Sequence, residues 1–255
     1  MMAVRHPTVV VTGASGAIGS ATVEVLKQRG AQVIALTRPS LDLSSMTSVR
    51  AAARELYRNG AHIDALLNIA AVFTTRFQKS ADGWEVMFAT NHLGPFLLTN
   101  LLRDRLIGGG RVITVTAPSA TRVEVNRLLD KSRFNAMHSF GASKAANLLF
   151  TFELARRAHR WEVLANAFHP GLVRSELMRE TPRFVRFLTR ATSSEPSRAA
   201  QDLVELALSP AFAGTTGWLF KGQRRIDAPK STQDTTQQEA LWKKSAELVE
   251  LEGGF

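Results

Sequence analysis

The sequence predicts an α/β fold in which a doubly wound parallel sheet carries helices on both faces. Three observations predict this class. Short apolar runs alternate along the chain with longer helix-forming segments, as expected when parallel strands are joined by helices. A glycine-rich turn directly follows the first apolar run. The 255 residues, 45% of them hydrophobic, are enough for one large α/β domain with a substantial core.

The first four predicted elements are a strand, a helix, a second strand and a second helix. A valine-rich run predicts a buried strand at Thr8–Thr12. The helix after it covers about Ala17–Arg29, because Gly30 stands where glycine usually ends a helix. The next apolar run predicts a strand at Val33–Leu36. A helix follows over Ser45–Tyr57, and its first serine can cap it.

The remaining elements alternate in the same way. Ala65–Leu67 predicts a third strand, and a long helix is predicted over Asp82–Leu102, before three consecutive glycines break it. Val112–Val115 predicts the fourth strand, and Phe140–Arg157 predicts the next helix. A final apolar run predicts a strand at Val163–Phe168, which a Pro-Gly pair ends. This alternation favours a parallel sheet with right-handed crossovers.

The turn after the first strand is suited to binding phosphate. Thr12–Gly19 contains three glycines, which allow a tight turn and a close approach of the backbone to a pyrophosphate. The helix that begins there offers free N–H groups and the positive end of its dipole. The segment therefore predicts a dinucleotide site. The alternative is a turn that has kept its glycines and lost its ligand.

Phe140 and Lys144 are the most informative pair in the chain. The segment Phe140-Gly141-Ala142-Ser143-Lys144 resembles the Tyr-x-x-x-Lys element of the short-chain dehydrogenases/reductases, with phenylalanine in place of tyrosine. A spacing of four places both side chains on one helix face. In that family the tyrosine hydroxyl passes a proton to or from the substrate oxygen, and the lysine holds the nicotinamide ribose. The resemblance implies an oxidoreductase scaffold without its usual proton donor.

Other segments carry the same resemblance, which covers nearly the whole chain and is closest to the retinol dehydrogenase-like branch. They are Thr12–Gly19, Asn68–Ala71, Asn91–Gly94 and His169–Ser175. The resemblance implies a single Rossmann-type domain over residues 1–255, with a substrate lid at about 175–195. It assigns Asn91 to the proton relay, where it supports a water that extends the relay to Lys144.

The resemblance also indicates a second lost hydroxyl. Arg111–Ala117 resembles the family's Arg-Ile-Val-Asn-Val-Ser-Ser, so the serine that hydrogen-bonds the substrate carbonyl corresponds to Ala117. Thr116 and Ser119 are nearby hydroxyls that could replace it. His138 could supply a proton, although such a residue is more often a plain loop histidine. Natural divergence and deliberate inactivation are both compatible with the two replacements.

Arg38 indicates the choice of cofactor. Family members that prefer NAD carry an acid at the end of the second strand for the ribose hydroxyls. Here Leu36-Thr37-Arg38 contains no acid, and a guanidinium can bind a 2′-phosphate bidentately. We therefore expect NADP; the alternative is an arginine that merely faces solvent. The cofactor-binding residues implied by the resemblance are Gly13, Ser15, Gly16, Ile18, Gly19, Arg38, Asp42, Leu43, Asn68, Ala70, Lys144, Pro170, Gly171, Val173 and Ser175.

The sequence departs from the family after the second strand. Only Arg38–Leu41 separates that strand from Asp42 and Leu43, where relatives usually place a helix and an edge strand. The loss of such a unit is tolerable, because an edge strand pairs with the sheet on one side only. We expect the helix-strand unit to be absent or vestigial, with Thr37–Ser44 as a short connection.

Composition narrows the classes of partner. The net charge of +10 predicts a solvated basic surface that also attracts anionic ligands. It does not predict nucleic-acid binding, because no basic motif is interleaved with aromatic residues.

With no cysteine and no metal-ligand spacing among six histidines, neither thiol chemistry nor a metal site is expected. The early first strand leaves no room for a signal peptide, and no apolar run is long enough to span a bilayer. We expect a cytoplasmic protein without membrane contact, and a homodimer is left open.

Three functions remain open from the sequence. The first is an NADP-dependent oxidoreductase that reduces a carbonyl, enone or imine-type small molecule. Ordinary ketone reduction should then be slow, since a positioned acid typically contributes about 10² to 10⁴ in rate. The second is an NADP-binding scaffold used for a non-redox reaction, as a cyclase or isomerase. The third is a non-catalytic cofactor-binding protein, since fold alone does not fix function.

Overall fold

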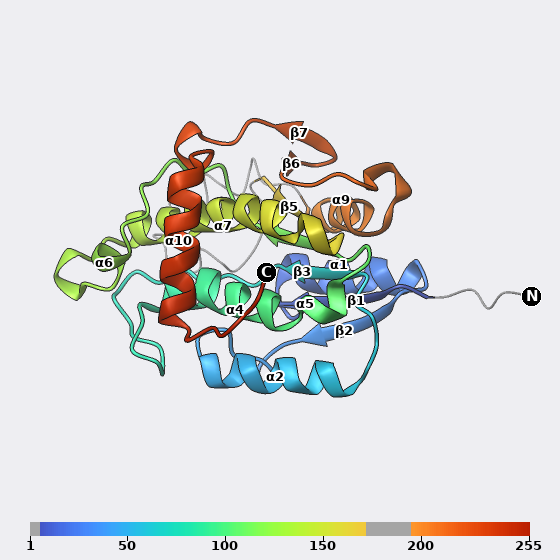
Figure 1. The fold of residues 1–255 in the computed structure, drawn as a ribbon, viewed down its shortest axis with the longest axis horizontal. Helices are drawn as coiled ribbons and strands as arrows, with labels where there is room; N and C mark the ends of the chain where they lie inside the picture. The colour runs from blue at the N-terminus through green and yellow to red at the C-terminus, as the bar shows by residue number, and fades with distance from the viewer. Residues whose placement is uncertain (1–5, 172–194) are drawn as a thin grey trace, which may run out of the picture.

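The computed structural model describes residues 6–171 and 195–255. A seven-stranded sheet lies at its centre, in the order β2-β1-β3-β4-β5-β6-β7. Neighbouring strands are parallel except for β7, which is antiparallel to β6. Helices cover both faces of this sheet (Figure 1). The predicted α/β class is confirmed, and the antiparallel last strand is the difference from the prediction.

The five predicted strands are present, each within one residue of its predicted ends. The strands are β1 Thr8–Thr12, β2 Gln32–Leu36, β3 Ala65–Asn68, β4 Arg111–Val115, β5 Leu164–His169, β6 Leu219–Lys221 and β7 Arg224–Ile226. The α-helices are α1 Ala17–Gln28, α2 Met46–Arg58, α3 Val86–Phe88, α4 Gly94–Leu101, α5 Arg103–Leu106, α6 Val125–Leu128, α7 Ala136–Ala158, α9 Pro196–Leu208 and α10 Thr235–Leu248. The prediction did not include β6, β7, α6, α9 or α10.

The central strands are buried on both faces, which explains their uninterrupted apolar runs. Val10 belongs to the core beneath α2, α4 and α7, whereas Val9 and Val11 belong to the core beneath α1 and α9. This alternation follows from the two-residue period of a strand. A strand between two helical layers therefore carries apolar residues at every position.

The second strand lies at one edge of the sheet, as the sequence predicts. Within the described chain, Thr37–Ser44 contains neither a helix nor a strand, and β2 pairs with β1 alone. Leu41 and Leu43 are buried in the core beneath α4 and α7. The short connection therefore covers the core with its own apolar side chains, and the usual edge unit is absent.

The helix predicted over Asp82–Leu102 is wrong at its start and in its interior. The Glu85 carboxylate accepts hydrogen bonds from the backbone N–H groups of Met87 and Phe88, at 3.0 and 2.9 Å, so the helix begins at Val86. Ala89–Leu93 then forms a π-helical turn before α4. The turn contains Thr90, Asn91 and His92, but all five of its residues are buried, so no exposed polar face reveals the inserted residue.

The helix predicted over Phe140–Arg157 begins four residues earlier than expected. The Asn135 side chain accepts a hydrogen bond from the His138 N–H at 2.9 Å, which caps α7. Phe140 therefore lies in the second turn of α7, and the first turn precedes it, beginning at Ala136.

The C-terminal helix α10 lies across α7 and α4 (Figure 1). The Trp242 ring lies 5.0 Å from the Phe96 ring and 5.8 Å from the Phe150 ring, measured between centroids. At the end of the chain, Phe255 is buried and its N–H donates to the Asn100 Oδ1 at 3.2 Å. The last twenty residues thus complete the core on this side of the sheet.

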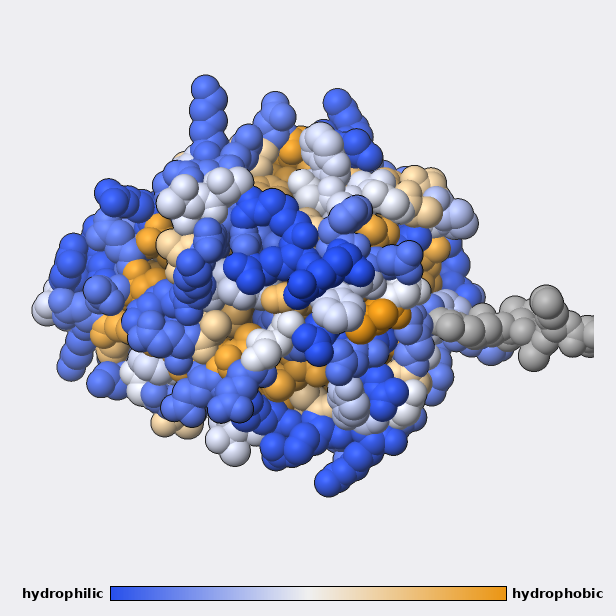
Figure 2. All heavy atoms as spheres, viewed as in Figure 1, coloured by the Kyte–Doolittle hydropathy of each residue, from blue (hydrophilic) through white to orange (hydrophobic). Residues whose placement is uncertain are grey.

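The surface seen in Figure 2 is mainly hydrophilic, with apolar residues in small separate areas. This agrees with the solvated charged surface expected from the net charge of +10. In the part of the chain that the structure describes, every helix is too short or too polar to traverse a bilayer.

His92 makes the stability of the fold depend on pH. Its ring is fully buried and stacks on Phe88, and burial lowers the pKa of His92 from 6.5 to about 4. Below pH 6.5 the unfolded chain binds a proton there that the folded chain binds only near pH 4, so stability falls as the pH falls through this window. The loss between pH 7 and pH 5 should be about 2 kcal/mol.

Denaturant titrations at these two pH values test this prediction. His92→Gln should remove this part of the difference, while the acidic residues titrate equally in both proteins. An unchanged difference in the variant would contradict the assignment to His92.

Candidate active site

The loop between β1 and α1 packs tightly against the end of β3. Gly13 has a φ of +66°, and a Cβ there would lie 2.7 Å from the Ala70 Cα. A Cβ at Gly19 would lie 2.1 Å from the carbonyl oxygen of Gly13. The Thr12 hydroxyl accepts from the Ile69 N–H at 3.1 Å and donates to the Leu67 carbonyl at 3.3 Å. The loop therefore depends on glycine at two positions, and Thr12 fixes it to the neighbouring strand.

A cavity of about 510 Å³ opens along this loop. Its walls include nine of the predicted cofactor residues, namely Gly13, Ser15, Gly16, Ile18, Gly19, Arg38, Asp42, Leu43 and Ala70. Arg38 is exposed at the rim. Asp42 accepts hydrogen bonds from the N–H and the hydroxyl of Ser44, at 2.9 and 2.7 Å, so its carboxylate is engaged within its own loop.

The other predicted cofactor residues lie at the same edge of the sheet or outside the described residues. Asn68 is buried at the end of β3 and donates to the Thr99 hydroxyl at 3.1 Å, beneath the cavity wall. Pro170 and Gly171 follow β5 directly. Val173 and Ser175 lie outside the described residues. The predicted lid at about 175–195 also lies outside them, except for Glu195, where the described residues resume.

Phe140 and Lys144 lie on one face of α7, as their spacing predicts. The Lys144 Nζ is 5.2 Å from the centroid of the Phe140 ring. The edge of one ring faces the other in the pair Phe73–Phe140, with centroids 5.5 Å apart. Phe73 is buried and also belongs to the cavity wall. The ring of Phe140 thus packs in an apolar contact.

Lys144 is a buried cation beside these rings. Burial lowers the pKa of Lys144 to about 8. Among the described residues, no carboxylate forms an ion pair with it. A lysine with this pKa is still mostly protonated at pH 7, so its ammonium keeps its hydrogen-bond donors, and Lys144 lies outside the residues that line the cavity.

Asn91 joins the cavity wall to α7 from the π-helical turn. Its Oδ1 accepts from the Val72 N–H at 2.7 Å, and its Nδ2 donates to the Val72 carbonyl and to the Ser143 hydroxyl, both at 3.0 Å. Both amide hydrogens are therefore used within the protein. The predicted water contact of Asn91 remains a prediction, and the side chain itself holds Val72 in the wall.

The hydroxyls near Ala117 are those of Thr116, Ser119 and Thr121, and each takes part in a hydrogen bond. Thr116 is buried and donates to the Lys144 backbone carbonyl at 2.8 Å. Ser119 donates to the Thr121 hydroxyl at 3.0 Å. A Cβ at Gly141 would lie only 2.5 Å from the Thr121 Oγ1, so this pair rests on α7 next to Phe140. Sequence analysis missed Thr121; the glycine directly after Phe140 was the available signal.

His138 does not share the face of Phe140 and Lys144. Two residues along a helix correspond to a rotation of about 200°. Burial lowers the pKa of His138, and the charges that act on it are those of Arg127, Glu124 and Arg133. It therefore faces α6 and the turn that follows it, and we do not retain it as the replacement acid. No group of residues suited to a metal ion occurs in the described ranges.

Comparisons with known proteins point in one direction. A family model described as short chain dehydrogenase matches residues 38–185. Retinol dehydrogenase 14 of Mus musculus is 33% identical, covering 95% of this chain and 85% of the relative. A solved structure of an uncharacterised protein from Mycobacterium paratuberculosis is 28% identical with a TM-score of 0.79, covering 98% of this chain and 95% of the other. The 3-alpha-hydroxysteroid dehydrogenase from Pseudomonas sp. B-0831, complexed with NADH, has a TM-score of 0.70 at 23% identity, covering 84% of this chain and 94% of the other.

The packing of the glycine-rich loop predicts which glycine the fold needs most. Gly19→Ala should lower the free energy of unfolding by about 1–3 kcal/mol, because its Cβ meets the backbone of Gly13. Gly16→Ala should have a smaller effect, since its Cβ would lie 3.3 Å from the Gly13 carbonyl oxygen. Thermal melts of both variants without cofactor measure the difference. Equal melting temperatures for the two variants would show that the loop relaxes more freely than this packing implies.

Proposed function

Since the chain belongs to the short-chain dehydrogenase family, we propose that it is an NADP-dependent oxidoreductase that reduces a carbonyl, enone or imine-type small molecule. Its site would be non-standard, with Phe140 and Ala117 where the family has tyrosine and serine. The proposal includes a small-molecule substrate and a cytoplasmic location.

One observation carries the proposal: a single cavity gathers the predicted cofactor residues of four separate segments. The glycine loop, the end of β2, the connection after it and the end of β3 all contribute to its wall. These segments meet because the carboxyl ends of parallel strands share one edge of the sheet. Glycine at positions 13 and 19 lets the loop backbone pack against Ala70 and against itself beside the cavity. This geometry suits a dinucleotide.

In this proposal, different residues bind different parts of NADPH. The start of α1 receives the pyrophosphate, and Arg38 receives the 2′-phosphate. Lys144 holds the nicotinamide ribose through its ammonium group. NADPH, when bound, supplies the hydride. The proton comes from water or the substrate, because the ring of Phe140 has none to give.

The contact between Phe140 and Phe73 favours a second candidate function. An apolar ring where the family has a hydroxyl also suits a scaffold that binds NADP and performs no reduction, either as a cyclase or isomerase or as a binding protein. Stopped-flow oxidation of bound NADPH with carbonyl, enone and imine substrates separates these functions. Turnover supports the oxidoreductase, product formation without NADPH oxidation supports the non-redox enzyme, and binding alone supports the third function.

We predict that NADPH binds more tightly than NADH because of Arg38. The ratio of dissociation constants should be about ten- to hundredfold, since a hydrogen bond to a charged group contributes about 1.5–3 kcal/mol. Arg38→Ala should abolish the preference. Arg58→Ala, which removes an equally exposed charge from α2, should leave it intact. Fluorescence titration measures both dissociation constants for each of the three proteins, and equal affinities in the unaltered protein would refute the role of Arg38.

We further predict that Phe140→Tyr combined with Ala117→Ser raises the reduction of simple carbonyls. The gain could approach the factor of about 10² to 10⁴ that a positioned acid supplies. The two changes should be non-additive, because the residues would act as one unit. Phe212→Tyr with Ala213→Ser is the matched control, at a site near α9 and far from the cavity wall. No gain in the double variant, with NADPH still bound, would mean that the pocket serves other chemistry.

A further inference from the structure

The π-helical turn Ala89–Leu93 is held from two sides by consecutive side chains. Asn91 reaches Val72 and Ser143, as described above. His92, the next residue, is directed into the core between α7 and α10. A π-helical turn is a rare conformation that needs support from its surroundings. These two side chains provide that support in the described structure.

His92 connects three helical segments by hydrogen bonds. Its Nε2 lies 2.8 Å from the Ser245 Oγ, and its Nδ1 lies 3.4 Å from the Asn147 Oδ1. All three side chains are buried. Since the Asn147 oxygen can only accept, Nδ1 carries the proton, and Nε2 then accepts from the Ser245 hydroxyl. A neutral ring, as expected from the lowered pKa of His92, satisfies both contacts.

Two parallel links therefore join the π-helical turn to α7. Asn91 contacts Ser143, and one helical turn further along α7, His92 contacts Asn147. Ser245 adds a third anchor from α10, 153 residues away from His92 in the sequence. A shift of His92 would move the adjacent Asn91, and with it the Val72 backbone that lines the cavity.

We propose that Ser245 is a positioning residue of the active site: its hydrogen bond to His92 fixes the π-helical turn, and that turn holds Asn91 and the Val72 wall in place. The C-terminal helix thus contributes to the geometry of a cavity that it does not line. The effect on cofactor binding rests on the proposed function, whereas the effect on Val72 does not.

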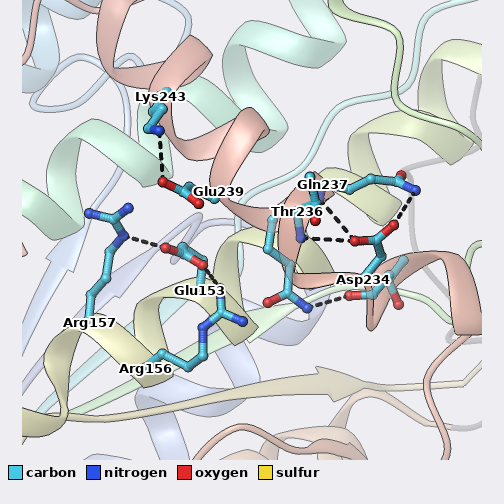
Figure 3. A network of polar contacts seen from close by, with 10 residues as sticks. Glu153, Arg156, Arg157, Asp234, Thr236, Gln237, Glu239 and Lys243 are labelled. Atoms are coloured by element: carbon cyan, nitrogen blue, oxygen red, sulfur yellow. Dashed lines mark hydrogen bonds and ion pairs between the residues drawn. The ribbon is translucent and has the colours of Figure 1, made fainter.

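Other contacts attach α10 to α7, so removal of the Ser245 hydroxyl should not release the helix. Within α7, Glu153 pairs with Arg156 and Arg157, which fixes the Arg157 side chain beside α10 (Figure 3). The Arg157 guanidinium also lies 4.7 Å from the centroid of the Trp242 ring. Asp234 caps α10 by accepting from the Thr236 and Gln237 N–H groups (Figure 3). These contacts lie away from His92.

Hydrogen exchange of the Val72 amide tests the proposal directly, because this N–H donates to the Asn91 Oδ1. In Ser245→Ala, exchange at Val72 should accelerate about fivefold or more, the factor that corresponds to one lost hydrogen bond. Ser245→Thr keeps the hydroxyl and should restore slow exchange. If Ser245→Ala does not fold, His92→Phe removes the same bond from its other end and keeps an aromatic ring beside Phe88. Because it also removes the contact with Asn147, it should accelerate exchange at least as much.

Gln238→Leu is the matched control on the same helix. Gln238 is buried and donates to the Thr232 carbonyl at 2.8 Å, so the variant loses one buried hydrogen bond of α10 away from His92. Exchange at Val72 should then stay at the level of the unaltered protein. Unchanged exchange in Ser245→Ala, or an equal acceleration in Gln238→Leu, would overturn the proposal.

Titration with NADPH adds a functional readout. Ser245→Ala should raise the dissociation constant about fivefold, in line with the exchange result, while Gln238→Leu should not change it. If the unaltered protein binds no NADPH, the proposed function fails, and the exchange at Val72 still decides the role of Ser245. Accelerated exchange with an unchanged dissociation constant would refute the link from Ser245 to the cofactor.

Discussion

The close packing of the β1–α1 loop against the end of β3 is the constraint on which the rest of the site depends. Gly13 meets the Ala70 backbone, and Gly19 meets the carbonyl of Gly13, at distances that exclude any side chain. Thr12 then hydrogen-bonds both neighbours of Asn68, which fixes the level at which β3 ends. Because the cavity forms where the strands end, this contact determines the shape of its floor. Phe140 and Ala117, the proposed catalytic positions, are not part of this contact, so substitutions there leave the packing of the loop undisturbed.

The fold was predictable wherever the core imposed a simple pattern. Strands between two helical layers are apolar at every position, and all five predicted strands are present. The three-residue strands β6 and β7 are too short to give such a run. The π-helical turn was not predictable, because residues 89–93 are all buried, including the polar Thr90, Asn91 and His92, so no exposed face records the inserted residue. Chain length alone predicted the missing edge unit, since the connection at Arg38–Leu41 has no room for it.

The candidate site was predictable where the motif is local and unpredictable where it depends on distant contacts. The spacing of Phe140 and Lys144 fixed their common face, and nine predicted cofactor residues line one cavity. The contact between His92 and Ser245 joins residues 153 positions apart, and neither residue carries a local signal of it. Thr121 was missed for the same reason: only the absent side chain of Gly141 indicates that a hydroxyl packs there. Sequence patterns thus identify the elements, and packing between them determines the remaining contacts.

Under the proposed function, the electrostatics of Lys144 explain how cofactor binding would persist with phenylalanine at position 140. A buried ammonium without a carboxylate partner loses hydration, which lowers the pKa of Lys144 to about 8. At pH 7 it remains mostly charged, so its ability to donate to a ribose hydroxyl does not require a hydroxyl at position 140. The face of the Phe140 ring also attracts the cation, in a contact that a phenylalanine makes as well as a tyrosine. Proton donation is different, because it needs an O–H at the substrate, and the apolar contact between Phe140 and Phe73 provides none. Under the proposed function, the two roles of the family's catalytic pair are therefore separable: Lys144 would still hold the cofactor, and the proton would come from another source.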